Sequence, residues 1–85
     1  MNADQLVGER VHVLMRRARI GQEQLGQVIG IAQASVSKKL LGQRSWTLDE
    51  LIAVARFLEV EPADLLPGPD YTPVLEGRGR ADRGG

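Results

Sequence analysis

The stretch QASVSKKL, residues 33–40, carries side chains that could hydrogen-bond to the edges of nucleic-acid bases. At about 100° per residue, a helix over residues 33–41 would turn Val36 and Leu40 inward. Its outward face would then carry Gln33 at the edge together with Ala34, Ser37, Lys38 and Leu41. Gln can make bidentate contacts to adenine, Lys can reach guanine, and the methyl group of Ala can touch that of thymine. This face suits a helix that enters a DNA groove.

The charge distribution agrees with such a partner, although the chain is neutral overall. There are 11 basic and 11 acidic residues, but they are unevenly placed. Residues 10–46 hold seven basic residues and one acidic residue, whereas residues 47–70 hold one basic residue and six acidic residues. No Asp or Glu occurs from Gln24 through Thr47. A chain divided in this way can present a positive face. Ordinary solvated charge remains the alternative until the basic residues are shown to share a face.

Length and composition limit the other classes of protein. Eighty-five residues make one domain, and without cysteine there is no disulfide framework or cysteine zinc site. The chain has no apolar run long enough to span a membrane and no signal peptide, so we expect a soluble cytoplasmic protein. His12, the single histidine, has no Cys, Ser or carboxylate partner spaced for catalysis. We therefore expect no enzyme activity, metal, cofactor, membrane contact or small-molecule ligand.

Apolar residues recur at helical spacing as far as Leu66, and no segment shows sustained strand alternation. We predict an all-α domain over residues 1–66, with helices at about 3–19, 22–29, 33–41, 47–59 and 62–66. Asn2 or Asp4 can cap the first helix. Thr47 and Glu50 have the spacing of a capping box, with Trp46 and Leu51 as its hydrophobic staple. Residues 67–85 are rich in Pro and Gly, which predicts a largely flexible tail.

Residues 10–66 resemble the lambda-repressor-like helix-turn-helix family, the Cro/repressor or XRE type, which includes phage and actinobacterial regulators. The resemblance rests on Gln-x-x-Leu-Gly, Gly-Ile, Ser-Val-Ser-Lys and Leu-Asp-Glu-Leu followed by Ala-x-x-Leu, all in register. It implies a compact five-helix domain in which helices 22–29 and 33–41 form the helix-turn-helix. It also implies a transcriptional regulator, most simply a phage-type repressor of the Cro or immunity class, that reads double-stranded DNA with helix 33–41.

The same resemblance assigns roles to individual residues. The base-reading positions are Gln33, Ala34, Ser37 and Lys38. The phosphate-contacting positions are Gln22, Ser35, Lys39, Gln43, Arg44 and Ser45. Lys39 lies beside the core face, so its stem could instead pack along that face. Weaker candidates for phosphate contact are Arg10, Arg16, Arg17 and Arg19 in the first helix.

Three departures from the family pattern concern packing and capping. Met15 and Leu40 occupy positions where many members carry an Arg–Glu ion pair, and two apolar residues predict a packed contact there instead. Gly21 and Ala32 replace the usual Ser or Thr caps of the second and third helices. Glycine is a tolerable cap, whereas alanine forfeits about 1 kcal/mol. Gly26 stands where Ala is typical, at the approach of the second and third helices.

Such domains usually bind palindromic operators as dimers, because one short helix contacts only about four to six base pairs. A homodimer on DNA is therefore possible here, with Leu65, Leu66 and residues 71–75 as the available surfaces. The rival interpretation is a helix-turn-helix module for protein–protein interaction, a regulatory adaptor or antitoxin-like partner. Its interface would combine the acidic fourth helix, an exposed Trp46 and the apolar side chains of Tyr71, Val74 and Leu75.

Overall fold

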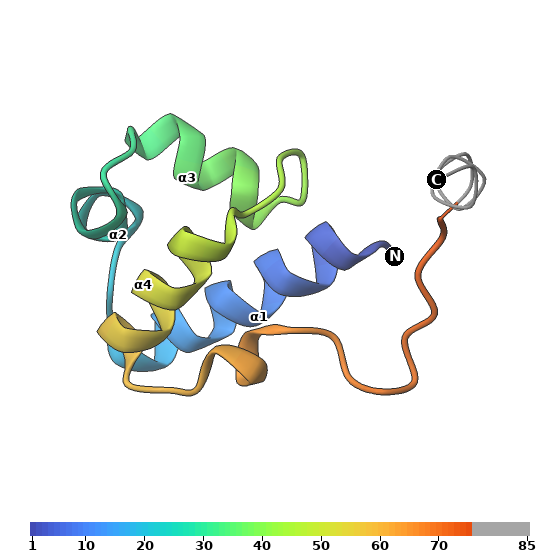
Figure 1. Ribbon diagram of the computed structural model, residues 1–85. Coiled ribbons are helices and arrows are strands. Elements are labelled where there is room, and N and C mark those ends of the chain that lie inside the picture. The colour runs from blue at the N-terminus through green and yellow to red at the C-terminus, as the bar shows by residue number, and fades with distance from the viewer. Residues whose placement is uncertain (76–85) are drawn as a thin grey trace.

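The computed structural model describes residues 1–75, which fold into four α-helices and one 3₁₀ turn around a shared core (Figure 1). The elements are α1 (Ala3–Ala18), α2 (Gln22–Ile29), α3 (Gln33–Leu40), α4 (Leu48–Leu58) and the 3₁₀ turn η1 (Pro62–Leu65). No strand occurs within residues 1–75, which confirms the all-α prediction for that range. In the same range, every helix falls short of the length or the apolar character that crossing a membrane requires.

Capping residues determine where α1 and α4 begin. The Asn2 side chain accepts a hydrogen bond from the Gln5 N–H at 2.8 Å, and the Gln5 side chain accepts one from the Asn2 N–H at 2.9 Å. Thr47 and Glu50 form the same reciprocal pair, at 3.0 and 2.9 Å. Each pair satisfies two N–H groups that a helix start leaves without partners. The predicted capping box of α4 is confirmed, and Asn2 is the cap of α1.

Glycines in the left-handed region follow α2 and α3. Gly30 has φ +76° and Gly42 has φ +80°, a region in which side chains other than glycine are strained. Beyond α3, the N–H of Gln43 bonds to the Lys38 carbonyl at 2.9 Å, and that of Gly42 bonds to the Lys39 carbonyl at 3.2 Å. These two bonds make a Schellman motif, which fixes the backbone just after α3.

The predicted fifth helix is wrong, because residues 62–65 form a single 3₁₀ turn. Pro62 begins the turn, and the N–H of Leu66 closes it on the Ala63 carbonyl at 3.2 Å. The backbone of Leu66 is extended, with φ −90° and ψ 157°. Proline at residue 67 explains this, since a residue that precedes proline avoids the helical region. Four α-helices therefore build the domain, and η1 closes it.

One apolar core joins all five elements. α1 packs against α3, α4 and η1, and α2 packs against α3 and α4. The side chains with no exposed surface are Val11, Leu25, Val36, Val54, Ala55 and Leu65. The prediction that Leu65 offers a surface for pairing two chains is wrong, because Leu65 is 0% exposed.

Gly8 allows α1 to approach the end of α3. A Cβ atom at this position would lie 2.7 Å from the carbonyl oxygen of Lys39, and closer still to that of Leu40. Met15 and Leu40 are both buried in the core, at the positions where the sequence predicted apolar packing. The C-terminal end of α3 is thus seated directly on α1.

Residues 67–75 continue beyond η1 without helix or strand and run away from the helices (Figure 1). Val74 and Leu75 are exposed there, and Tyr71 is half-buried. The rest of the predicted tail, residues 76–85, lies outside the described residues.

Candidate nucleic-acid interface

The junction of α2 and α3 is a short turn built around Gly26. The N–H groups of Gly30 and Ile31 both bond to the Gly26 carbonyl, at 2.8 and 2.9 Å. A Cβ atom on Gly26 would lie 2.6 Å from the Ile31 carbonyl oxygen. The alanine that is typical of the family at this position would therefore force the backbone to shift. Glycine allows the turn to fold back against α2, and this holds α3 at an angle to it.

The outward face of α3 is polar and accessible. Val36 and Leu40 point into the core as predicted, while Gln33, Ala34 and Lys38 are exposed. Ser37 is half-buried at the edge of that face. The structure thus brings the four proposed base-reading residues to one side of one helix, with Ser37 the least accessible of them.

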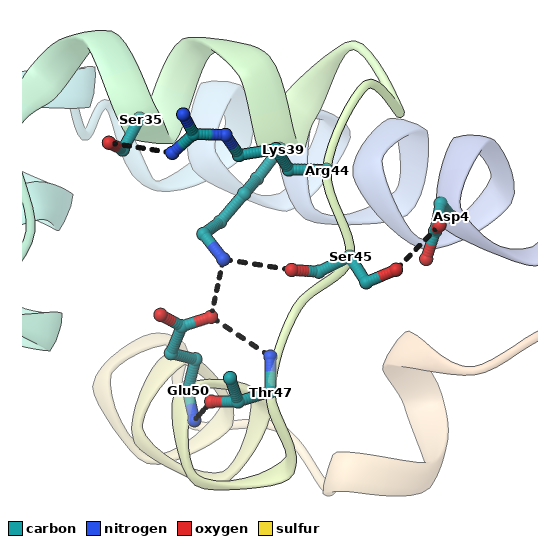
Figure 2. Close-up of polar contacts among 7 residues, drawn as sticks. All are labelled: Asp4, Ser35, Lys39, Arg44, Ser45, Thr47 and Glu50. Atoms are coloured by element: carbon teal, nitrogen blue, oxygen red, sulfur yellow. Dashed lines mark hydrogen bonds and ion pairs between the residues drawn. The ribbon is translucent and has the colours of Figure 1, made fainter.

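Four of the residues predicted to contact phosphate flank this face. Gln22 begins α2 and is half-buried, and Gln43 and Arg44 are exposed in the loop between α3 and α4. Nη1 of Arg44 donates to the Ser35 hydroxyl oxygen at 3.3 Å, which draws the loop toward α3 (Figure 2). A guanidinium has five N–H donors, so Arg44 keeps others for a ligand.

Ser45 has less to offer a phosphate than the sequence predicted. Its hydroxyl donates to Oδ2 of Asp4 at 2.7 Å, and its carbonyl accepts from Lys39 (Figure 2). The hydroxyl hydrogen is therefore used within the protein, and the nearest carboxylate would repel a phosphate. Asp4 belongs to the first turn of α1, so this bond links the loop to α1.

The prediction that Lys39 contacts phosphate does not fit the structure. Lys39 is only 7% exposed, and its Nζ donates to the Ser45 carbonyl at 2.8 Å and to Oε1 of Glu50 at 2.9 Å. Its ammonium is thus satisfied internally and paired with a carboxylate (Figure 2). Residue spacing does not reveal this partner, because Glu50 follows eleven residues later in another helix.

The pKa of Glu50 reflects this pairing. Burial alone would raise the pKa of the carboxyl. The hydrogen bond from the Thr47 backbone and the interactions with the Lys39 ammonium outweigh burial, so the pKa lies below its ordinary value of 4.5. Glu50 is therefore ionised when it caps α4 and pairs with α3.

Trp46 is buried, not exposed as the protein-interaction interpretation assumed. It is 8% exposed and belongs to the same core as Leu51, its predicted partner in the hydrophobic staple. Its ring centroid lies 5.9 Å from Nζ of Lys39. The indole Nε1 is buried without a hydrogen-bond partner.

The basic residues do not all share one face. Arg10, Arg16 and Arg17 line a cavity of about 600 Å³ between α1 and residues 60–64, where Nη1 of Arg10 donates to the Asp64 carbonyl at 2.9 Å. Gly8 meets α3, and Arg10, two residues later, is turned by about 160° around the helix. Arg10 therefore lies on the side of α1 away from α3. Lys38 and Arg44 are the cations that remain exposed on the described α3 and its following loop.

Within residues 1–75, no group of three or more His, Cys, Asp or Glu side chains is arranged to hold a metal ion. The polar side chains described above are suited to hydrogen-bonding and charge contacts along an extended ligand. Their arrangement is a surface composed of α3, the start of α2 and the α3–α4 loop.

Comparison with known proteins identifies the family. The profile of the BetR domain matches residues 2–76. The chain belongs to the BetR domain family. A search of curated protein sequences gives no match.

Two solved structures of regulators resemble this BetR domain. The restriction-modification controller protein C.AhdI from Aeromonas hydrophila is 27% identical with a TM-score of 0.68, over 73% of this chain and 94% of its own. The P22 c2 repressor, solved with a synthetic operator, is 28% identical with a TM-score of 0.68, over 75% of this chain and 97% of its own. These likenesses and the family match confirm the predicted helix-turn-helix family.

The fold also occurs in an enzyme. Hydroxypropylphosphonic acid epoxidase from S. wedmorenis has a TM-score of 0.72 and 20% identity over 85% of this BetR domain, which spans only 40% of the epoxidase chain. At this identity the likeness shows the shared fold alone.

Proposed function

We propose that this BetR domain is a transcriptional regulator that binds double-stranded DNA sequence-specifically, with α3 in the major groove. The observation that carries the proposal is the outward face of α3. Gln33, Ala34 and Lys38 are exposed there, opposite the buried Val36, and no carboxylate occurs from residue 24 through residue 47. A helix of this kind can pass between phosphates and place its side chains against base edges.

In this proposal two sets of residues have different tasks. Gln33, Ala34, Ser37 and Lys38 contact bases. Gln22, Ser35, Gln43 and Arg44 contact phosphates and fix the orientation of the domain on the duplex. Ser35 and Ser37 are half-buried, so we expect them to contribute less to DNA binding than the exposed residues beside them.

We further propose a repressor of the phage type that pairs on a palindromic operator, in the nucleoid of a bacterium or of a phage host. The 28% identity with the P22 c2 repressor supports the class. For pairing, Leu48 and Ile52 lie one turn apart on α4, and Leu48 is 77% exposed. Together with the exposed Leu66 they offer apolar surface to a second copy.

The test is selection of bound duplexes from a random DNA pool, followed by titration of the enriched sequence at two salt concentrations. Counterion release lowers the logarithm of the affinity with a slope of about −0.9 per phosphate neutralised. An enriched palindrome with steep salt dependence supports a dimeric operator-binding regulator, and an enriched half-site supports a monomer. No enrichment and no salt dependence would leave the protein-interaction module, which has already lost Trp46 as an exposed anchor.

A further inference from the structure

One buried cation connects α3 with the loop and helix that follow it (Figure 2). Nζ of Lys39 donates to the Ser45 carbonyl at 2.8 Å and to Oε1 of Glu50 at 2.9 Å. It also lies 5.9 Å from the centroid of the Trp46 ring, within the range of a cation–π attraction. A single ammonium thus contacts the loop, the residue before the α4 cap, and the first turn of α4.

Glu50 shares its carboxylate between two tasks. The same Oε1 that pairs with Lys39 accepts the N–H of Thr47 at 2.9 Å, which closes the capping box of α4. The side chains of Lys39 and Glu50 are 9% and 15% exposed. Burying two charges costs desolvation, and an apolar pair of the same volume is often as stable. The distinctive contribution of the ion pair is therefore a fixed direction between α3 and α4.

The loop is held from its other sides as well. Ser45 donates to Asp4 of α1 at 2.7 Å, and Arg44 donates to Ser35 of α3 at 3.3 Å. The Schellman bonds fix the backbone at Gly42 and Gln43. The exposed Arg44 is thus carried by a loop with attachments to α1, α3 and α4.

We infer that Lys39 and Glu50 are positioning residues for DNA binding, which fix residues 42–46, and with them Arg44, relative to α3 without touching DNA themselves. The predicted effect on DNA binding rests on the proposed function. The predicted effect on the loop, which should lose its order without this pair, does not depend on that function.

The decisive variant is the double change Lys39→Met with Glu50→Gln. It removes both charges together, so the local net charge is unchanged, and the glutamine carbonyl can still accept the Thr47 N–H. Affinity for the duplex enriched from the random pool should fall about tenfold, and the salt slope should become shallower toward that of Arg44→Met, because a displaced guanidinium no longer neutralises its phosphate. Arg44→Met is the control background: in it, the same double change should cost little further affinity, since the residue that the pair positions is already gone. Unchanged affinity in the double variant, or an equally large loss in both backgrounds, would overturn the inference.

Glu50→Gln alone tests whether DNA affinity rises or falls when the carboxylate partner of Lys39 is weakened. If Lys39 contacted phosphate, weakening its carboxylate partner would free the ammonium and strengthen binding to DNA. If the pair positions the loop, the same change weakens binding. All DNA titrations are made well below the thermal unfolding midpoint of each variant, so that unfolded protein does not lower the measured affinity.

A measurement without DNA separates failure of this inference from failure of the proposed function. Backbone ¹⁵N relaxation of residues 43–46 should give order parameters of about 0.85 in the unmodified chain and below about 0.6 in the double variant. The turn at residues 30–32 is the internal control and should not change. An equally ordered loop in the double variant would overturn the inference whether or not the protein binds DNA.

Discussion

The two ends of α3 are built differently. At its start, Ala32 supplies no side-chain hydrogen bond, and the carbonyl of Ala32 accepts the N–H groups of Ser35 and Val36 at 3.0 and 3.1 Å. At its end, the Schellman bonds fix the backbone, and the ammonium of Lys39 is bound to Ser45 and Glu50. The start is left with N–H donors that no side chain caps, whereas the end is bound to the following loop and to α4.

This difference separates positioning from contact. A helix of eight residues is not stable alone, so α3 owes its existence to tertiary contacts. Those contacts are concentrated on the inward side and at the C-terminal end, where Gly8 and Lys39 lie. The outward side of α3 keeps Gln33, Ala34 and Lys38 exposed and free to meet a ligand. The helix is therefore anchored through its inward side and its C-terminal end, while the proposed base contacts lie on its outward side.

The largest expected effect on stability comes from disrupting the contact between α1 and the C-terminal end of α3. Gly8→Ala would put a Cβ atom 2.7 Å from the Lys39 carbonyl oxygen, and backbone cannot move aside cheaply. We expect the free energy of unfolding to fall by about 2–3 kcal/mol, measured by urea denaturation.

Gly68→Ala is the matched control, because no atom lies within 4 Å of the added methyl group. Its free energy of unfolding should stay within about 0.5 kcal/mol of the unmodified chain. Equal effects at the two glycines would show that the approach of α1 to α3 is not constrained by Gly8.

The part of this architecture that sequence predicts is the part that local signals encode. Helix starts at Asn2 and Thr47 and the helix end at Gly30 follow from residue types within a few positions of each boundary. The inward placement of Val36 and Leu40 follows from helical spacing, so the outward face of α3 could also be predicted.

What sequence did not predict depends on contacts between elements. The Lys39–Glu50 pair joins two helices, and neither residue type nor spacing distinguishes a buried lysine from a phosphate-binding one. Burial of Trp46 and Leu65 likewise depends on how α4 and η1 close over the core. The position of Arg10 away from α3 follows from where Gly8 docks. Local rules do not contain these relations.

The next largest effect concerns DNA binding by the outward face of α3. Lys38→Ala should weaken binding to the selected duplex by about 1–3 kcal/mol and relax the preference at one base position, because a base contact carries sequence information. Repeating the selection with the variant measures both.

Arg44→Ala is the contrasting variant for that experiment. A phosphate contact has no sequence preference, so affinity should fall alike for selected and scrambled duplexes. If Lys38→Ala and Arg44→Ala lose affinity in the same uniform way, the proposed division between base and phosphate contacts is wrong.

A smaller effect should follow from giving the open end of α3 the cap it lacks. Ala32 has the extended backbone of a cap residue, with φ −69° and ψ 153°. Ala32→Ser should therefore raise the free energy of unfolding by about 1 kcal/mol, measured by urea denaturation. Asn2→Ala, which removes an existing cap from α1, should lower it by a similar amount. No gain at Ala32 alongside a loss at Asn2 would mean that the start of α3 is already satisfied in another way.

The smallest expected effect is the pH dependence of the anchored end. Burial raises the pKa of Glu50, the Thr47 N–H and the Lys39 ammonium lower it, and the net result lies below 4.5. A depressed folded-state pKa stabilises the fold above the unfolded-state value, and this stabilisation is lost as pH falls through the folded-state value. On acidification below about pH 4.5, the unmodified chain should therefore lose more stability than Glu50→Gln does.

Lys39→Met keeps the carboxyl but removes the hydrogen bond and the charge interaction with Lys39 that lower its pKa, so its loss of stability should be intermediate. The measurement is urea denaturation of the three proteins across that pH range, in which the other carboxyls cancel from the differences. Identical pH profiles for the unmodified chain and Glu50→Gln would mean that the ion pair does not contribute to the anchoring of α3.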